Sequence, residues 1–172
     1  AGREDTLVVV LPSGPNSLDI HRSGTNRPSY AVAVNAYDRL VSFGSKVLPN
    51  GTTMYKYDEI VPELAESWEF AADGMSMAFK LREDATFHDG SPVTAEDVKW
   101  SFDRAVSVGG FSAVQMKAGS LEKPEQFSVV DDHTFKIDFI RKSKLTLPDV
   151  GVPVPVILNS KLVKQHVTEK DP

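Results

Sequence analysis

Histidine and carboxylate side chains are the residues with the widest chemistry in this chain, and metal binding is the first function they suggest. A metal site needs two or more ligands held together, such as histidines one helical turn apart. The four histidines fall on four separate segments, at His21, His88, His133 and His166. The run Asp131-Asp132-His133 falls at an expected hairpin turn, where Asp bonds the local backbone. We therefore expect no metal site and no cofactor.

Nucleophilic and acid–base catalysis have little support in the sequence. The absence of Cys removes thiol catalysis, thiolate metal ligands and disulfides. The chain has no Gly-x-Ser-x-Gly motif, no phosphate-binding glycine loop and no Gly-x-Gly-x-x-Gly run after its first expected strand. We predict a protein without enzymatic activity. One alternative is kept, a secreted hydrolase whose Asp, Glu and His side chains, His88 and Asp89 first among them, act as acid and base.

Composition and charge narrow the class of protein further. The chain has 172 residues, with 19 Lys and Arg against 24 Asp and Glu, a net charge of −5, and 41% of its residues are hydrophobic. This describes one folded domain or a piece of a larger protein. The absence of basic blocks argues against nucleic acid as a partner. The longest apolar run, residues 7–11, is too short to span a membrane, and the polar residues 1–5 predict no signal peptide in this chain.

The N-terminal part is expected to form a strand, a loop and a helix. Residues 6–11 are apolar and partly β-branched, which predicts a buried strand. The Pro, Ser, Gly and Asn residues of 12–26 predict a loop. From Ser29 onward apolar residues recur at helical spacing, which predicts a helix that ends near Phe43-Gly44. The apolar stripe of this helix is Ala33, Ala36, Tyr37, Leu40 and Val41.

Two hairpins and a helix are expected in the middle of the chain. Alternating apolar and polar residues predict hairpins over residues 68–81 and 127–139. Turns are marked by the runs Pro49-Asn50-Gly51, Asp73-Gly74, Phe87-His88-Asp89-Gly90 and Asp131-Asp132-His133. Between the hairpins, Thr94 is a typical N-cap and predicts a helix that ends at Gly109-Gly110.

The C-terminal part completes the predicted fold class. Its three prolines predict an extended passage over residues 148–156. Asn159-Ser160 is expected to cap a short helix that ends around His166. With only three helices beside these strands, the sequence predicts an α/β fold of the mixed α+β kind.

One region of the chain carries a more specific signal than these patterns. It contains the runs Ile60-Val61-Pro62-Glu63-Leu64-Ala65-Glu66-Ser67-Trp68-Glu69, Phe79-Lys80-Leu81-Arg82, Phe87-His88-Asp89-Gly90, Thr94-Ala95-Glu96-Asp97-Val98 and Ser101-Phe102. In this order the runs resemble the signature region of the large extracytoplasmic solute-binding proteins of ABC importers, family 5, the class with dipeptide-, oligopeptide-, nickel- and opine-binding members. Ser17-Leu18-Asp19 and Tyr37-Asp38-Arg39-Leu40-Val41 also fit, so the resemblance extends over nearly the whole chain.

The resemblance implies a fold similar to the type II periplasmic binding proteins, in which two lobes close over a ligand. This chain resembles only the N-terminal part of such proteins. Residues 1–45 are then expected to begin lobe I with a strand, a ligand-facing loop and a helix. Residues 46–172 are expected to form its subdomain of hairpins and helices, with the chain truncated before the second lobe.

The function implied by the resemblance is that of a non-enzymatic protein. It would capture a small solute outside the cytoplasmic membrane and deliver it to the membrane permease of an ABC importer. We expect a peptide as the ligand, with an opine, an oligosaccharide or a nickel complex as the other classes. The protein would be periplasmic or at the cell surface, and a monomer at full length.

The resemblance also implies ligand-binding residues. Dipeptide-binding members meet their ligand with the loop that follows the first strand, where this chain has Ser23-Gly24-Thr25; an ordinary Ser/Gly turn is the alternative. A Gly there lets the ligand approach the backbone, whose N–H groups bind it. Asn26 and Arg27 follow, and an Arg binds a carboxylate with two hydrogen bonds. Relatives also line the cleft after their second helix, where this chain has Phe111 and Ser112, with core packing as the alternative for Phe111.

Overall fold

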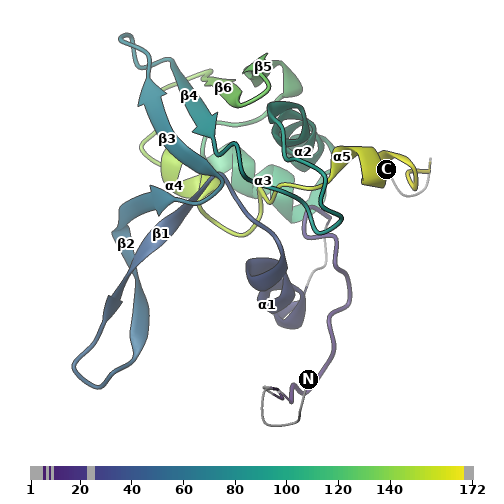
Figure 1. Cartoon of the computed structure of the whole chain (residues 1–172). Helices are drawn as coiled ribbons and strands as arrows, with labels where there is room; N and C mark the ends of the chain where they lie inside the picture. The colour runs from purple at the N-terminus through teal and green to yellow at the C-terminus, as the bar shows by residue number, and fades with distance from the viewer. Residues whose placement is uncertain (1–5, 7, 9, 23–25, 169–172) are drawn as a thin grey trace.

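The computed structural model of the chain describes residues 6, 8, 10–22 and 26–168. Within them the chain forms two antiparallel sheets, of four and of two strands, and five α-helices (Figure 1). The elements in chain order are α1 Arg27–Ala36, β1 Val41–Val47, β2 Thr53–Pro62, β3 Ala65–Phe70, β4 Ser76–Leu81, α2 Ala95–Ser107, α3 Gly110–Ala118, the 3₁₀ helix η2 Pro124–Gln126, β5 Phe127–Asp131, β6 Thr134–Asp138, α4 Thr146–Val150 and α5 Ser160–Lys164. The predicted mixture of helices and strands is confirmed, and the predicted number of three helices is too low.

The four-stranded sheet consists of the two predicted hairpins. Its strand order is β3-β4-β6-β5, and every neighbouring pair is antiparallel. The hairpins join where β4 pairs with β6, so that Met77 lies opposite Ile137 and Phe79 lies opposite Phe135. These four side chains are completely buried. Because successive residues of a strand point to opposite faces, the apolar residues of each strand share the inner face of the sheet.

The turns of the two hairpins form where the Asp and Gly residues predict them. Asp73 Oδ1 accepts a hydrogen bond from the Met75 N–H at 2.8 Å, and Gly74 has a φ of +66°. Asp131 Oδ1 accepts a hydrogen bond from the His133 N–H at 2.9 Å. Both carboxylates therefore bond the local backbone, which is the structural role predicted for the second turn.

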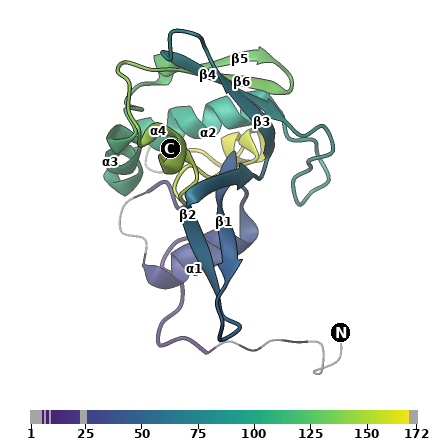
Figure 2. The same cartoon turned by 90° about the vertical axis from the view of Figure 1, so that its left-hand side faces the viewer.

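Helix α2 covers the inner face of this sheet (Figure 2). Its apolar stripe of Val98, Phe102 and Ala105 is completely buried. The centroid of the Phe102 ring lies 5.3 Å from that of Phe127 and 5.1 Å from that of Phe135. Aromatic pairs at such distances add to the stabilisation from burial. The helix and the two hairpins thus share one apolar core.

Both ends of α2 lie where the sequence predicts them. The N–H and hydroxyl of Thr94 donate to Asp97 Oδ2 at 3.1 and 2.8 Å. The other Asp97 oxygen accepts hydrogen bonds from the N–H and hydroxyl of Ser160 at 3.1 and 2.7 Å, so one buried carboxylate joins the beginnings of α2 and α5. Gly109 and Gly110, with φ of +77° and +73°, end α2. The chain then continues into α3, a helix that the sequence analysis did not predict.

The extended passage predicted over residues 148–156 is wrong in its first part, because Pro148 lies in α4. It is the third residue of this short helix, where an N–H group has no intrahelical acceptor and the fixed φ of Pro suits the helix. Residues 151–159 are outside helices and strands. Helix α5 begins as predicted after Asn159, whose Oδ1 accepts a hydrogen bond from the Leu162 N–H at 3.0 Å.

The first predicted helix is too long. Helix α1 ends at Ala36 rather than near Phe43-Gly44, and Val41 already begins β1. Leu40 and Val41 fit the helical spacing, but both are completely buried in the main core. The Leu40 carbonyl accepts a hydrogen bond from the Ala65 N–H at 2.9 Å, which holds this part of the chain extended. Contacts with residues far away in the sequence therefore decide the structure at residues 40–41, although their spacing fits a helix.

Strands β1 and β2 form a hairpin that projects away from the four-stranded sheet (Figure 2). Its turn is the predicted one, since the Gly51 N–H donates to the Leu48 carbonyl at 2.9 Å and Gly51 has a φ of +81°. Three aromatic rings lie close together on this hairpin. The ring centroids are 5.5 Å apart for Phe43 and Tyr57, 6.0 Å for Tyr55 and Tyr57, and 6.4 Å for Phe43 and Tyr55. Its aromatic residues therefore pack with one another.

The strand predicted over residues 6–11 is not formed at the described positions. Thr6, Val8 and Val10 lie in no strand, and the Val8 and Val10 side chains are 72% and 88% exposed. A strand needs a neighbour that bonds its N–H and C=O groups. In the described part of the chain, the strands of the two sheets are β1 to β6, and none of them includes these positions.

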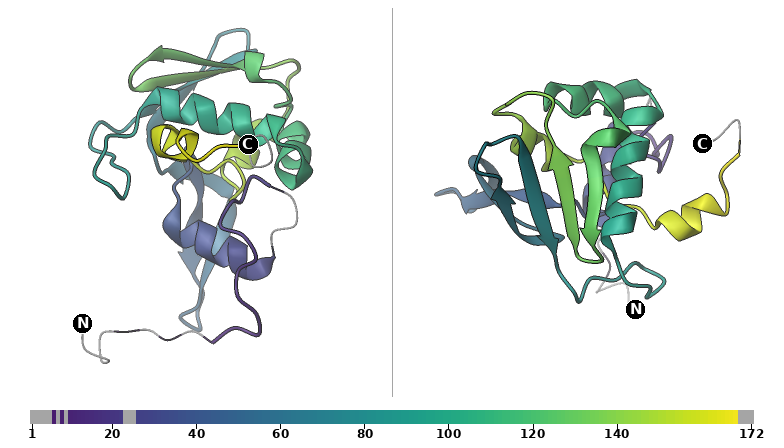
Figure 3. Two further views of the ribbon diagram at one scale, coloured as in Figure 1. Left: turned by 90° about the vertical axis from the view of Figure 1, so that its right-hand side faces the viewer. Right: turned by 90° about the horizontal axis from the view of Figure 1, so that it is seen from above.

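A second and smaller apolar cluster packs α1, which lies below the four-stranded sheet in the left view of Figure 3, against residue 20 and residues 156–158. Its buried members are Ile20, Ala33 and Val156, with Tyr30, Tyr37 and Leu158 packed against them. The Ile157 N–H also donates to the Asp38 carbonyl at 2.9 Å. Residue 20 and residues 156–158 therefore both pack against α1 and the chain that follows it.

Among the described residues, no helix has the length and apolar character needed to cross a membrane.

Candidate functional site

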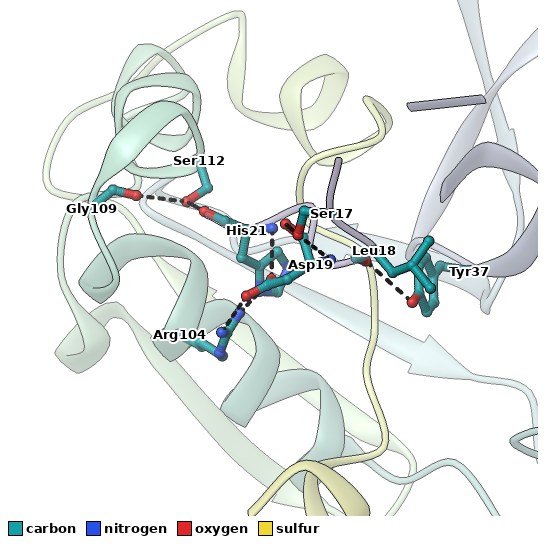
Figure 4. A network of polar contacts seen from close by, with 8 residues as sticks. All are labelled: Ser17, Leu18, Asp19, His21, Tyr37, Arg104, Gly109 and Ser112. Atoms are coloured by element: carbon teal, nitrogen blue, oxygen red, sulfur yellow. Dashed lines mark hydrogen bonds and ion pairs between the residues drawn. The ribbon is translucent and has the colours of Figure 1, made fainter. Parts of the chain in front are cut away.

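The segment of residues 16–22 receives polar contacts from several elements (Figure 4). Arg104, in the last turn of α2, donates from its two terminal nitrogens to the two carboxylate oxygens of Asp19 at 2.8 and 2.6 Å. The Arg104 side chain is 8% exposed and the Asp19 side chain 27% exposed. A two-point pair between Arg and a carboxylate fixes orientation as well as distance. The pair therefore holds Asp19 in one position against α2.

His21 lies two residues further along and is completely buried. Its N–H donates to Asp19 Oδ1 at 3.1 Å, and its carbonyl accepts a hydrogen bond from the Ser112 hydroxyl of α3 at 2.5 Å. Burial lowers the pKa of His21 to about 4, the Arg104 charge acts in the same direction, and Asp19 opposes them. The imidazole is therefore neutral at neutral pH, because burial disfavours its charged form.

The charge of Asp19 depends on opposing effects. Burial raises the pKa of its carboxyl, but the hydrogen bonds and charge of Arg104, together with the interactions of His21, bring the pKa below its ordinary value. The carboxylate is therefore ionised and paired at neutral pH. On the other side of this segment, the Tyr37 hydroxyl donates to the Leu18 carbonyl at 3.3 Å, and burial raises the pKa of Tyr37.

A second set of contacts joins the start of this segment to the start of α1. The Asn26 N–H donates to Asn16 Oδ1 at 3.0 Å, and the Asn16 N–H donates to Asn26 Oδ1 at 3.3 Å. Asn26 is also the N-cap of α1, because its Oδ1 accepts a hydrogen bond from the Ser29 N–H at 3.1 Å. The two asparagines therefore bring residues 16 and 26 side by side and fix them to the helix.

Four of the predicted ligand-binding residues lie at the beginnings of two helices. Ser23-Gly24-Thr25 is outside the described residues. Asn26 precedes α1, and Arg27 is its first residue, with an exposed side chain. Phe111 and Ser112 lie in the first turn of α3. The described residues of the prediction thus lie at the N-terminal ends of α1 and α3.

The structure brings these two helices together. The Phe111 ring, which is 45% exposed, lies edge to face with the ring of Tyr30 of α1 at 6.4 Å. Ser112 is completely buried, and its hydroxyl is bonded to the His21 carbonyl. Residues that are far apart in the sequence therefore meet around the segment before α1. A role for them in ligand binding stays a prediction.

Asp19, Arg104 and Asn16 belong to this site but were not singled out by the sequence analysis. Asp19 entered only as part of the run Ser17-Leu18-Asp19. Arg104 adjoins Ala105 in the buried stripe of α2. A charged residue beside a buried stripe is the signal that points to such a pair, since a buried charge needs a partner.

Two cavities lie near these residues. The smaller, about 270 Å³, opens beside the ion pair and is lined by Asp19, Tyr37, Arg104, Leu158 and His166 among others. The larger, about 870 Å³, lies between the end of α1, residues 82–93 and residues 157–163, and none of the predicted ligand-binding residues lines it. In the part of the chain that the structure describes, no three His, Asp or Glu side chains are grouped so as to hold a metal ion.

His88 and Asp89, the residues of the hydrolase alternative, line the larger cavity. The Asp89 carboxylate accepts hydrogen bonds from the N–H and hydroxyl of Ser91 at 2.9 and 2.6 Å and from the Asn159 amide at 3.0 Å. The hydrogen bonds from Ser91 and Asn159 lower the pKa of Asp89. A general acid needs a pKa near the working pH. The geometry of Asp89 is instead that of a group that joins a turn to the start of α5.

Comparison with known proteins identifies the family. The family model "Bacterial extracellular solute-binding proteins, family 5 Middle" matches residues 59–172. The chain belongs to this family. Among family 5 relatives, the probable D,D-dipeptide-binding periplasmic protein DdpA of Escherichia coli K12 is 30% identical over 169 residues, covering 96% of this chain and 30% of DdpA. The dipeptide-binding protein of the same organism is 30% identical over 173 residues, covering 91% of this chain and 30% of that protein.

A solved family 5 structure has the same fold. AgaA, the periplasmic binding protein of A. tumefaciens R10 in complex with agropinic acid, is similar with a TM-score of 0.69 and 27% identity, covering 92% of this chain and 29% of AgaA. The predicted family and the predicted fold class are therefore confirmed. The chain spans about 30% of the length of these curated relatives.

Proposed function

We propose that the family 5 protein containing this chain is the substrate-binding component of an ABC importer. It captures a small solute outside the cytoplasmic membrane and delivers it to the permease, acting in the periplasm or at the cell surface as a monomer without enzymatic activity. The family match over residues 59–172 carries this proposal. The periplasmic relative DdpA supports the location.

A peptide is the proposed ligand. The support comes from two relatives at 30% identity whose names specify dipeptides. An opine is the second class, because AgaA was solved with agropinic acid. An oligosaccharide and a nickel complex complete the set of ligands to be tested.

The proposed ligand contacts are those of the sequence analysis, at Ser23-Gly24-Thr25, Asn26, Arg27, Phe111 and Ser112. Their support is that Asn26 and Arg27 begin a helix whose Tyr30 contacts Phe111. Residues 1–45 are proposed to begin lobe I and residues 46–172 to form its subdomain. The main apolar core lies almost entirely in the second of these parts.

Calorimetric titration of the full-length protein tests the proposal. The probes are L-Ala-L-Ala, tri-L-alanine, agropinic acid, maltotriose and a nickel–histidine complex, with free L-alanine as the control. We expect saturable binding of a peptide at a stoichiometry of one and no heat from L-alanine. Saturation by agropinic acid alone changes the ligand class to an opine. The absence of binding to every probe contradicts the proposed function.

A further inference from the structure

The turn of the β1–β2 hairpin contains a pair of residues whose chemistry the proposed function does not use. Asn50 is followed directly by Gly51, and it is the only asparagine of the chain with a Gly after it. The backbone nitrogen of the next residue can attack an asparagine carboxamide, and a Gly leaves this nitrogen unshielded because it has no Cβ. The other asparagines precede Ser, Arg or Ala, at Asn16, Asn26, Asn35 and Asn159.

This turn is exposed to solvent. Residues 49–55 are all exposed, and the hairpin projects away from the four-stranded sheet (Figure 2). Apart from the two residues next to Gly51, no described atom lies within 4 Å of the position that a Cβ would take there. Water and hydroxide therefore have access to the Asn50 carboxamide and to the Gly51 nitrogen.

The Asn50 side chain is folded back onto the backbone that follows it. Its Oδ1 accepts a hydrogen bond from the Thr52 N–H at 3.0 Å, which turns the carboxamide toward residues 51 and 52. The same N–H stabilises the negative charge that this oxygen acquires when Cγ is attacked. One bond opposes the attack, because the Gly51 N–H donates to the Leu48 carbonyl at 2.9 Å. Exposed hydrogen bonds at such places open at low cost in free energy, so this bond delays the reaction without preventing it.

We propose that Asn50 is a site of spontaneous deamidation. The Gly51 nitrogen gives its proton to hydroxide and forms a bond to Asn50 Cγ. The bond from Cγ to Nδ2 then breaks, and ammonia leaves with a proton from water. The resulting five-membered succinimide takes up one water molecule, whose attack on either carbonyl yields aspartate or isoaspartate. Overall one water replaces one ammonia, and the reaction needs no oxidant or reductant.

The reaction changes the tip of the hairpin. Both products carry a new negative charge, and isoaspartate also inserts one CH₂ group into the main chain before residue 51. The turn depends on short-range bonds, since the Leu48 N–H donates to the Thr52 carbonyl at 2.8 Å, and a longer main chain disturbs their register. The change stays local, because Val47 and Thr53, the last pair of the ladder, are exposed and belong to neither apolar core.

Incubation of the full-length protein, followed by trypsin digestion and mass spectrometry, tests this inference. Trypsin cuts after Lys46 and Lys56 and releases residues 47–56, in which Asn50 is the only asparagine. Protein L-isoaspartyl methyltransferase with a labelled methyl donor then marks isoaspartate and not aspartate. A sample digested without incubation gives the background.

Two controls accompany this measurement. The matched variant is Asn50→Gln, which keeps the carboxamide on a longer side chain that would have to close a six-membered ring. The internal control is Asn35, which is exposed on α1 and followed by Ala.

The expected result is a deamidated fraction at Asn50 at least tenfold above that at Asn35 after the same incubation. The fraction is larger at pH 9 than at pH 7, because the attacking nitrogen must lose its proton, and residues 47–56 are methylated. Asn50→Gln shows neither signal. A ratio below tenfold, or deamidation of residues 47–56 without methylation, overturns the inference.

Discussion

The four-stranded sheet with α2 and the N-terminal segment with α1 are held in the same chain by different forces. The first region has an apolar core in which side chains as large as Phe79, Phe102 and Phe135 are completely buried. Among the described residues, the cluster of the second region has three buried apolar members, Ile20, Ala33 and Val156. Its polar contacts include the Asp19–Arg104 ion pair and the hydrogen bonds between Asn16 and Asn26.

The two kinds of contact have different effects: apolar burial mainly stabilises the fold, and polar contacts mainly fix the position of a segment. Apolar burial is favourable in proportion to area and has no preferred direction, so the sheet region supplies most of the free energy of folding. Charge-assisted hydrogen bonds specify both distance and angle. The polar contacts of the N-terminal region therefore specify its position more than they add to stability.

The largest expected effect is on the sheet region. Phe102→Ala removes a completely buried ring that contacts Phe127 and Phe135, and we expect a loss of about 4 kcal/mol in the free energy of unfolding. Urea denaturation followed by circular dichroism measures it. Val130→Ala, at a side chain that is 60% exposed, is the control and should change stability by about 0.5 kcal/mol or less. A loss below about 1 kcal/mol in Phe102→Ala would mean that this core does not dominate folding.

The second effect belongs to the N-terminal region and depends on pH. Burial lowers the pKa of His21 from 6.5 to about 4 in the folded protein, so the unfolded state takes up a proton first as the pH falls. Stability is therefore complete above about pH 6.5 and declines between there and about pH 4. From pH 7 to pH 5 we expect a loss of about 2 kcal/mol from this group. The lowered pKa of Asp19 acts in the same direction only below its ordinary value of 3.8.

Variants isolate this pH effect from the titration of other groups. Denaturant unfolding at pH 7 and pH 5 is compared for the wild type, His21→Gln and His88→Gln. We expect His21→Gln to lack most of the difference between the two pH values, and His88→Gln, at an exposed turn, to keep it. An unchanged pH dependence in His21→Gln would show that its environment is more polar than its complete burial indicates.

The two regions also differ in how well the sequence predicts them. The hairpins and α2 follow from local features, namely alternation along β4 and β6, the N-cap Thr94 and the glycines that end α2. The end of α1 was mispredicted because Leu40 and Val41 satisfy a helical period but are buried by contacts with a distant part of the chain. Residues 6–11 carry a strand pattern, yet no strand of the described chain pairs with their described positions.

The candidate site was predicted only in part. The resemblance to family 5 implied ligand contacts in the loop before α1 and at Phe111 and Ser112 after α2, and in the structure Phe111 contacts Tyr30 of α1. The contact of Asp19 with Arg104 joins residues 85 positions apart, and no local pattern specifies which carboxylate a given Arg will bind. The same holds for Asn16 and Asn26, which read as ordinary loop residues until the chain is folded.

The smallest expected effect lies at the start of α2. Thr94→Ala removes the hydroxyl that donates to Asp97, the carboxylate that also binds Ser160. Loss of a helix N-cap typically costs about 1 kcal/mol, and thermal or urea unfolding measures it. Ligand affinity should be unchanged, with Thr52→Ala, at an exposed position, as the control for both quantities. A large loss of affinity with normal melting would place Thr94 in the ligand site instead.

The central claim is that the solute binds at the N-terminal region and not in the larger cavity. Hydrogen exchange of the full-length protein, with and without saturating L-Ala-L-Ala, tests this most directly. The account predicts slower exchange at residues 16–30 and 110–112 when the dipeptide is bound, and no change in β3, β4, β5 and β6. Protection confined to residues 82–93 and 157–163, which line the larger cavity, would contradict it.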